Sequence, residues 1–162
     1  MIEFRSHRIL APLLALGLVS LAPPALACRA NDEAALKVRE VVEGLVAADN
    51  ERDIGHVLEY YAADAVLLPP NEQPVTDRDE IQRRYVGLFE SFTPQIEARV
   101  DEICVDDTLA VVRGHNGGWM VTREGGLTRQ LDDVYLMVLR LETSGDWKIS
   151  RLMWHSGSPT PR

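Results

Sequence analysis

The chain has 162 residues, of which 46% are hydrophobic, and its 17 Lys and Arg against 25 Asp and Glu give a formal net charge of −8. This composition suits one buried core and is not that of a disordered chain. The acidic balance argues against nucleic-acid binding, because a nucleic-acid site needs a basic face to neutralise phosphates. Two cysteines exclude a disulfide-rich scaffold and a four-cysteine zinc site.

The first 27 residues have the pattern of a secretory signal peptide. Residues 1–8 carry two arginines, and residues 9–22 are an apolar stretch. That stretch is too short to span a bilayer core of about 30 Å. Pro23–Pro24 breaks any helix, and Ala25–Ala27 is an A-x-A cleavage site. We expect an exported protein, periplasmic or secreted, with no transmembrane helix.

Cleavage after Ala27 would make Cys28 the first residue of the mature chain. One expectation is free secretion, with or without the Cys28–Cys104 disulfide that an oxidising compartment permits. The alternative is a lipid anchor on Cys28. Bacterial lipoboxes usually place leucine three residues before the cysteine, where this chain has Ala25, and its leucine is Leu26.

The segment after the leader is predicted to be mainly helical. Apolar residues at helical spacing predict three helices: one capped by Asn31 and ending at Asp49–Asn50, a shorter one from Asp53 through Tyr61, and one capped by Thr76 whose inner face runs from Ile81 through Tyr85 to Phe92. Between the second and third helices, residues 65–68 are expected to form a short strand that Pro69–Pro70 closes.

Beyond Pro94 the apolar period changes to about two residues, which is the spacing of strands. We expect strands at residues 96–104, 109–122, 127–141 and 147–155, joined by turns at Asp106–Asp107, Glu124–Gly126 and Ser144–Asp146. Helices followed by an antiparallel meander make an α+β domain. We expect one domain over residues 28–156 and a loose tail over residues 157–162.

Residues 53–66 (DIGHVLEYYAADAV) place a helix, an aromatic pair and an Ala-x-Asp-Ala segment before a strand; Pro69–Pro70, Asp79–Ile81 and the run Gly145–Arg151 (GDWKISR) follow. The pattern resembles the nuclear-transport-factor-2-like superfamily, especially its SnoaL-like and ketosteroid-isomerase-homologue domains, over about residues 33–156. The resemblance implies a cone-shaped (cystatin-like) fold, in which a curved antiparallel sheet wraps around three N-terminal helices and encloses an apolar pocket.

The resemblance does not decide activity, because one fold hosts many functions. The position of the isomerase base, just after the first strand, holds Leu68–Pro70, and the family's helix tyrosine falls near Leu45. None of these side chains transfers a proton, so ketosteroid isomerisation by that mechanism is not expected. Arg99–Asp101 resembles the Arg-x-Asp of limonene-type epoxide hydrolases but lies one strand too early, and we interpret it as solvent-side charges.

The remaining candidate catalytic residues lie on the later strands. Asp133 shares a face with apolar neighbours by period-two parity, so it is a candidate acid or base, with His115 as its partner. Alternatively, Asp133 is a strand-end residue or a partner of Arg129, and His115 is structural. Candidate ligand-lining residues, which could equally be core or interface residues, are Tyr61, Arg113, Trp119, Tyr135 and Trp154.

Cofactor chemistry has no sequence support. The chain lacks the spacings typical of metal ligands and the G-x-S-x-G motif of a nucleophile, so we expect neither a metal nor another cofactor. The glycine-rich segment Gly114–Gly118 lies inside the meander, where it is expected to mark a bulge or bend and not a phosphate loop.

Three functions stay open. The first is an exported protein that binds a small apolar or amphipathic molecule. The second is a cofactor-independent isomerase, cyclase or hydratase that uses Asp133 and His115. The third is an association domain similar to the oligomerisation domain of calcium/calmodulin-dependent kinase II. We favour binding, because the family's catalytic positions are apolar here, and we expect a homodimer through the sheet.

Overall fold

A computed structural model describes residues 33–157 of the chain. The expected signal peptide, the cap Asn31 and the first cysteine, Cys28, lie outside the described residues, as does most of the expected tail. Helices and strands follow in the order α1-α2-β1-α3-β2-β3-β4-β5. This confirms the predicted α+β fold, with N-terminal helices followed by a curved sheet.

The three helices are α1 (Glu33–Glu51), α2 (Ile54–Glu59) and α3 (Arg78–Ser91). Asp53 caps α2, because its carboxylate accepts a hydrogen bond from the backbone N–H of His56 at 3.0 Å. The cap of α3 is Asp77, whose carboxylate accepts from the N–H of Glu80 at 2.9 Å. The predicted cap Thr76 is therefore wrong by one residue: the helix begins at Arg78, and Asp77 holds the extended cap conformation.

The five strands are β1 (Tyr61–Leu68), β2 (Phe92–Asp106), β3 (Leu109–Thr122), β4 (Thr128–Leu141) and β5 (Trp147–Ser156). The strand β1 begins four residues earlier than predicted, where the second helix was expected to continue. The reason is tertiary: the N–H of Ile149 on β5 donates to the carbonyl of Tyr60 at 2.8 Å, and Tyr61 pairs with Ile149.

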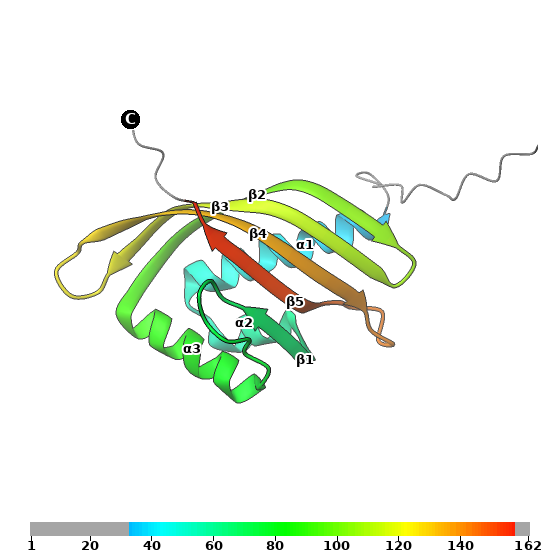
Figure 1. Ribbon diagram of the computed structural model, residues 1–162, viewed down its shortest axis with the longest axis horizontal. Helices are drawn as coiled ribbons and strands as arrows, with labels where there is room; N and C mark the ends of the chain where they lie inside the picture. The colour runs from blue at the N-terminus through cyan, green and yellow to red at the C-terminus, as the bar shows by residue number, and fades with distance from the viewer. Residues whose placement is uncertain (1–32, 158–162) are drawn as a thin grey trace, which may run out of the picture.

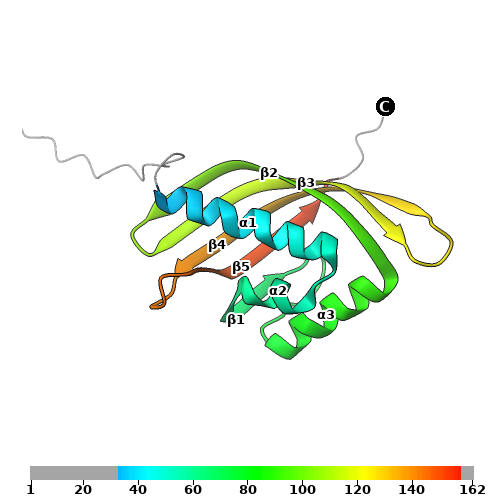
Figure 2. The ribbon, with the colours of Figure 1, turned by 180° about the vertical axis from the view of Figure 1, so that it is seen from behind.

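The sheet has the order β1-β5-β4-β3-β2, with β1 parallel to β5 and the other neighbours antiparallel. All three helices lie on one side of the curved sheet (Figure 1), and the reverse view shows α1 running across the long strands (Figure 2). The core forms between α1 and this inner face of the sheet, from Val38, Val42, Leu45, Val112, Tyr135, Met137 and Leu139. Each such side chain contributes roughly 1.5–3 kcal/mol on burial.

Two contacts shape the edge of the sheet near β2. The amide of Asn50 donates to the carbonyl of Ile96 at 2.9 Å and accepts from its N–H at 2.7 Å, so it acts as a strand partner for the edge strand. A side chain at Gly118, whose φ is 113°, would overlap the backbone of Gln95. The end of α1 is therefore fixed to β2, and the glycine lets β2 and β3 approach closely. The pairing of β2 with β3 shifts its register once, between Val100 and Glu102 of β2.

Within residues 33–157, none of the helices is both long enough and apolar enough to cross a membrane.

Candidate functional site

The predicted catalytic pair Asp133 and His115 is separated by the sheet. Asp133 pairs with Asn116 and with Ser156, and it is buried on the inner face together with Tyr135. His115 precedes Asn116 on β3, so its side chain lies on the opposite, outer face. The structure therefore does not bring these two predicted residues together on one face of the sheet.

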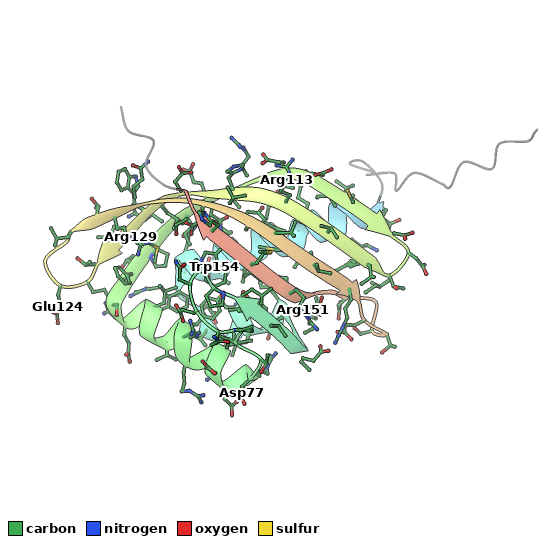
Figure 3. All side chains as sticks on the ribbon, in the orientation of Figure 1. Asp77, Arg113, Glu124, Arg129, Arg151 and Trp154 are labelled. Atoms are coloured by element: carbon green, nitrogen blue, oxygen red, sulfur yellow. The ribbon has the colours of Figure 1, made fainter. Side chains whose placement is uncertain are left out.

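The five predicted lining residues also divide between the two faces. Tyr61 and Tyr135 are core residues, 3% and 1% exposed. Trp154, which is labelled in Figure 3, pairs with Tyr135 on the inner face. Trp119 is 45% exposed on the outer face, and Arg113 lies on the side of the sheet away from the helices (Figure 3). The structure therefore does not gather them into a single pocket.

Asp49, at the end of α1, carries a carboxyl that is shielded from water. Its Oδ1 atom is buried, and it has no hydrogen-bond partner in the described part of the chain. Burial raises the pKa of Asp49 from 3.8 to about 7, because a carboxylate loses solvation there that no donor replaces. Near neutral pH this side chain can therefore hold or release a proton.

Two tyrosines form a hydrogen-bonded pair in the same part of the interior. The hydroxyl oxygens of Tyr61 on β1 and Tyr85 on α3 lie 2.7 Å apart, and the ring of Tyr85 also contacts Phe89, with centroids 5.7 Å apart. Burial raises the pKa of both phenols, and the charge of Asp49 raises each further. Both hydroxyls therefore stay protonated. We call Asp49, Tyr61 and Tyr85 the interior triad.

The interior triad combines one carboxyl group and two phenolic hydroxyls in apolar surroundings. Asp49 can donate when protonated and accept when ionised, and each phenol can do both. Such a set can hold a hydroxyl or carbonyl group of a small molecule and can exchange a proton with it. The spacing of α3 predicted Tyr85 on its inner face, but the sequence places Asp49 only at a helix end.

A second group of charged residues surrounds Asp101 on the outer face. Its carboxylate lies 2.9 Å from Nε of Arg99, 3.1 Å from Nη1 of Arg113 and 2.7 Å from Nδ1 of His115. Burial alone would raise the pKa of Asp101, but the hydrogen bond and charge of Arg99, and then those of His115, outweigh it and lower the pKa. We call Arg99, Asp101, Glu102, Arg113 and His115 the outer-face cluster.

The structure records Cys104 on β2 as disulfide-bonded. The partner predicted for it, Cys28, lies outside the described residues, so the identity of the bridge stays a prediction. In residues 33–157, no three His, Cys, Asp or Glu side chains are grouped as metal ligands would be.

Comparison with protein families gives a match to the SnoaL-like domain over residues 42–151. The chain belongs to the SnoaL-like domain family. A comparison with curated proteins gives no match.

Solved structures share the fold at low sequence identity. A ketosteroid isomerase-like protein from Erwinia carotovora is 23% identical with a TM-score of 0.73, and the match covers 80% of this chain and 100% of that one. A nuclear transport factor 2-like superfamily protein from Salmonella enterica is 14% identical with a TM-score of 0.67, over 80% and 96%. A cystatin-like-fold protein from Nostoc punctiforme is 14% identical with a TM-score of 0.62, over 78% and 92%. At these identities the likeness establishes the fold alone.

Proposed function

We propose that this SnoaL-like protein binds a small, mainly apolar molecule through the interior triad. The observation that carries the proposal is the buried Oδ1 of Asp49, which has no partner among the described residues. An unsatisfied buried polar atom costs about 1–3 kcal/mol, and a ligand that donates a hydrogen bond to it would offset that cost. The adjoining hydroxyls of Tyr61 and Tyr85 supply further donors and acceptors. The ligand we expect carries one hydroxyl or carbonyl group on an apolar body.

A second candidate function is cofactor-independent proton transfer at the same residues. It is favoured by the pKa of about 7 at Asp49, since an acid or base works best when its pKa lies near the operating pH. The description of the Erwinia relative as ketosteroid isomerase-like supports this class of chemistry. In this version Asp49 takes the role that the sequence suggested for Asp133, and the tyrosine pair polarises a carbonyl.

Native mass spectrometry of the mature chain purified from its native host tests the binding proposal. We expect a co-purifying organic molecule that is lost from Asp49→Leu and reduced in Tyr61→Phe. The matched control is Glu90→Gln, which changes an exposed carboxyl on α3 and should retain the molecule. A wild-type chain without any bound molecule, or one that keeps it in both triad variants, would contradict the proposal. Incubating the released molecule with fresh protein then separates binding from turnover.

We also propose that two copies meet through the outer face of the sheet. Leu109, Val111, Val134, Leu136 and Met153 are exposed there by 37–54%, and we call this set the apolar stripe. A second copy would remove this apolar area from water. The outer-face cluster adjoins the stripe and carries both signs of charge, so a twofold axis could pair acidic groups of one copy with basic groups of the other.

Sedimentation of the wild type and of Leu136→Asp tests this dimer. We expect a dimer that Leu136→Asp converts to a folded monomer, because the new carboxylate would be buried without a partner at the interface. Glu90→Gln on α3, on the other side of the sheet, should leave the dimer intact. A monomeric wild type would contradict both the dimer and the association-domain alternative.

Export with a Cys28–Cys104 disulfide is part of the same proposal. One sulfur atom of Cys28 cannot hold both a disulfide and a lipid thioether, so the two alternatives exclude each other within a single molecule. We expect the denatured mature protein to show no titratable thiol and a mass without lipid. Two thiols per chain would overturn the bridge, and a diacylglycerol mass increment would establish the anchored form.

A further inference from the structure

A hollow of about 290 Å³ opens on the outer face across three neighbouring strands. Its lining comes from Glu97, Ala98 and Arg99 of β2, His115 and Gly117 of β3, and Asp132 of β4. Gly117 forms the floor: a side chain added there would meet no atom within 4 Å. The hollow exists because Gly117, which has no side chain, lies between Glu97 of β2 and Asp132 of β4 in one row across the sheet.

The charged side chains around the hollow lie in two rows across the strands, one acidic and one basic. Gly117 pairs with Glu97 on one side and with Asp132 on the other, so two carboxylates flank the open floor. The next outward-facing row, two residues along the strands and about 7 Å away, holds Arg99 paired with His115. One end of the hollow is therefore acidic, and the other end supplies a guanidinium and an imidazole.

The two carboxylates differ from that of Asp101 in having no side-chain partner in the described part of the chain. Neither Glu97 nor Asp132 makes a side-chain hydrogen bond or ion pair with any described residue. Asp101, by contrast, is surrounded by Arg99, Arg113 and His115. The carboxylates of Glu97 and Asp132 therefore stay outside the outer-face cluster. They lie beside the guanidinium of Arg99, whose Nε contacts Asp101 and whose Nη2 contacts His115. Its Nη1 makes no hydrogen bond with a described residue.

Asp101 also fixes the orientation of the His115 ring. Its carboxylate lies 2.7 Å from Nδ1, and Nη2 of Arg99 lies 3.0 Å from the same nitrogen. These two contacts hold the Nδ1 edge of the ring, so Nε2 is the ring nitrogen that remains for a ligand. The β-bulge between Val100 and Glu102 contributes to this arrangement, because it turns Asp101 toward the outer face beside His115.

We propose that this hollow is a binding site for a basic α-amino acid of the lysine type. Its two ammonium groups would each pair with one free carboxylate, Glu97 or Asp132, and its carboxylate would accept from Arg99. Such a ligand neutralises every open charge of the hollow, whereas a phosphate or a dicarboxylate would meet the acidic end. The volume is at the small end for ligand sites, which suits an amino acid.

This site is independent of the interior triad, because the sheet lies between them. It adjoins the apolar stripe at His115, whose partner across the ladder is Val134. In the proposed dimer it would therefore lie at the rim of the interface, where solvent still reaches it.

An NMR titration of the full mature chain with L-lysine at low salt tests the proposal. We expect localised amide shifts at residues 97–99, 115–117 and 132, and binding about tenfold weaker with either norleucine or cadaverine. Norleucine lacks the second cation and cadaverine lacks the carboxylate, and about 1.4 kcal/mol for each lost charged contact corresponds to tenfold. Equal binding of all three probes, or no localised shifts, would overturn the site.

Variants separate the hollow from general charge effects. Glu97→Gln and Asp132→Asn should each weaken L-lysine binding about tenfold, and Gly117→Leu should abolish it by filling the floor. Glu90→Gln removes another exposed carboxylate, on α3, and should bind like the wild type. If Glu90→Gln weakens binding as much as Glu97→Gln, the attraction is one of net charge and the proposal fails. Asp49→Asn should not change lysine binding, so this test does not depend on the proposed function.

Discussion

Two aspartates on opposite sides of one sheet show how surroundings decide what a carboxyl can do. Asp101 on the outer face has a side chain only 18% exposed, yet three basic side chains contact it, and its pKa falls. Asp49 on the helix side is also shielded from solvent but meets no donor, and its pKa rises to about 7. Burial raises the pKa of both carboxyls, so the presence or absence of basic partners decides whether the pKa falls or rises overall. The unpaired group is the one suited to bind a ligand or move a proton.

The largest expected effect concerns Asp49 and the dependence of stability on pH. Between pH 3.8 and about 7 the folded chain keeps a proton on Asp49 that the unfolded chain releases. The free energy of unfolding should therefore fall as pH rises through this window, by up to about 4 kcal/mol at about 1.4 kcal/mol per pKa unit. Asp49→Asn should remove this decline and be more stable than the wild type at pH 8.

Urea unfolding at several pH values from 4 to 8 measures that effect. The control is Asp132→Asn, which changes an exposed aspartate on β4 and in which the decline assigned to Asp49 should persist. A profile that is the same in the wild type and in Asp49→Asn would mean that Asp49 is solvated or paired in the folded chain, and the contrast with Asp101 would disappear.

A smaller effect is expected from the tyrosine pair beside Asp49. Tyr61→Phe removes one member of the 2.7 Å hydrogen bond and leaves the hydroxyl of Tyr85 unpaired in the interior. The expected loss of stability is about 1–3 kcal/mol. The double variant Tyr61→Phe/Tyr85→Phe should recover part of it, because no unsatisfied hydroxyl remains. Thermal unfolding of the two single variants and the double variant gives the coupling between the residues, and strictly additive losses would argue against a functional pair.

The smallest effect is expected at Asp101. Its folded-state pKa is lowered, so its contribution to stability is present above its ordinary pKa and is lost as the pH falls through the folded value. Asp101→Asn should cost less stability than Tyr61→Phe, and added salt should reduce the difference, since the cluster faces solvent. It should also change the ¹⁵N shifts of the His115 ring, because a neutral amide replaces the carboxylate that lies 2.7 Å from Nδ1. Unchanged ring shifts would show that Asp101 does not orient His115.

Local signals in the sequence predicted much of the fold. The bounds of β3, Leu109–Thr122, agree with the prediction because turn residues mark both of its ends. The start of β1 was missed, since its first residue is recruited by β5 from far along the chain. The cap of α3 was misplaced by one residue because Thr76 and Asp77 are both acceptable caps.

The candidate site was harder to predict, because it depends on contacts between elements. The alternation of side chains along a strand correctly predicts which residues of that strand share a face. It does not predict the register between β3 and β4, and so does not show which face of β3 continues which face of β4. The pairing of Asn116 with Asp133 decides this and puts His115 on the other side. Asp49 looked like an ordinary helix end, and its burial follows only once Asn50 fixes α1 to the edge strand.

The most direct test is a measurement of the carboxyl pKa of Asp49 itself. A ¹³C NMR titration of aspartate-labelled mature chain, with the Asp49 signal assigned by its absence in Asp49→Asn, reports each carboxyl separately. The structure predicts one aspartate signal that titrates near pH 7 and disappears in the variant. If the Asp49 signal titrates near pH 4 like an exposed aspartate, the carboxyl is not the unpaired buried group described above, and the interior triad is not the site.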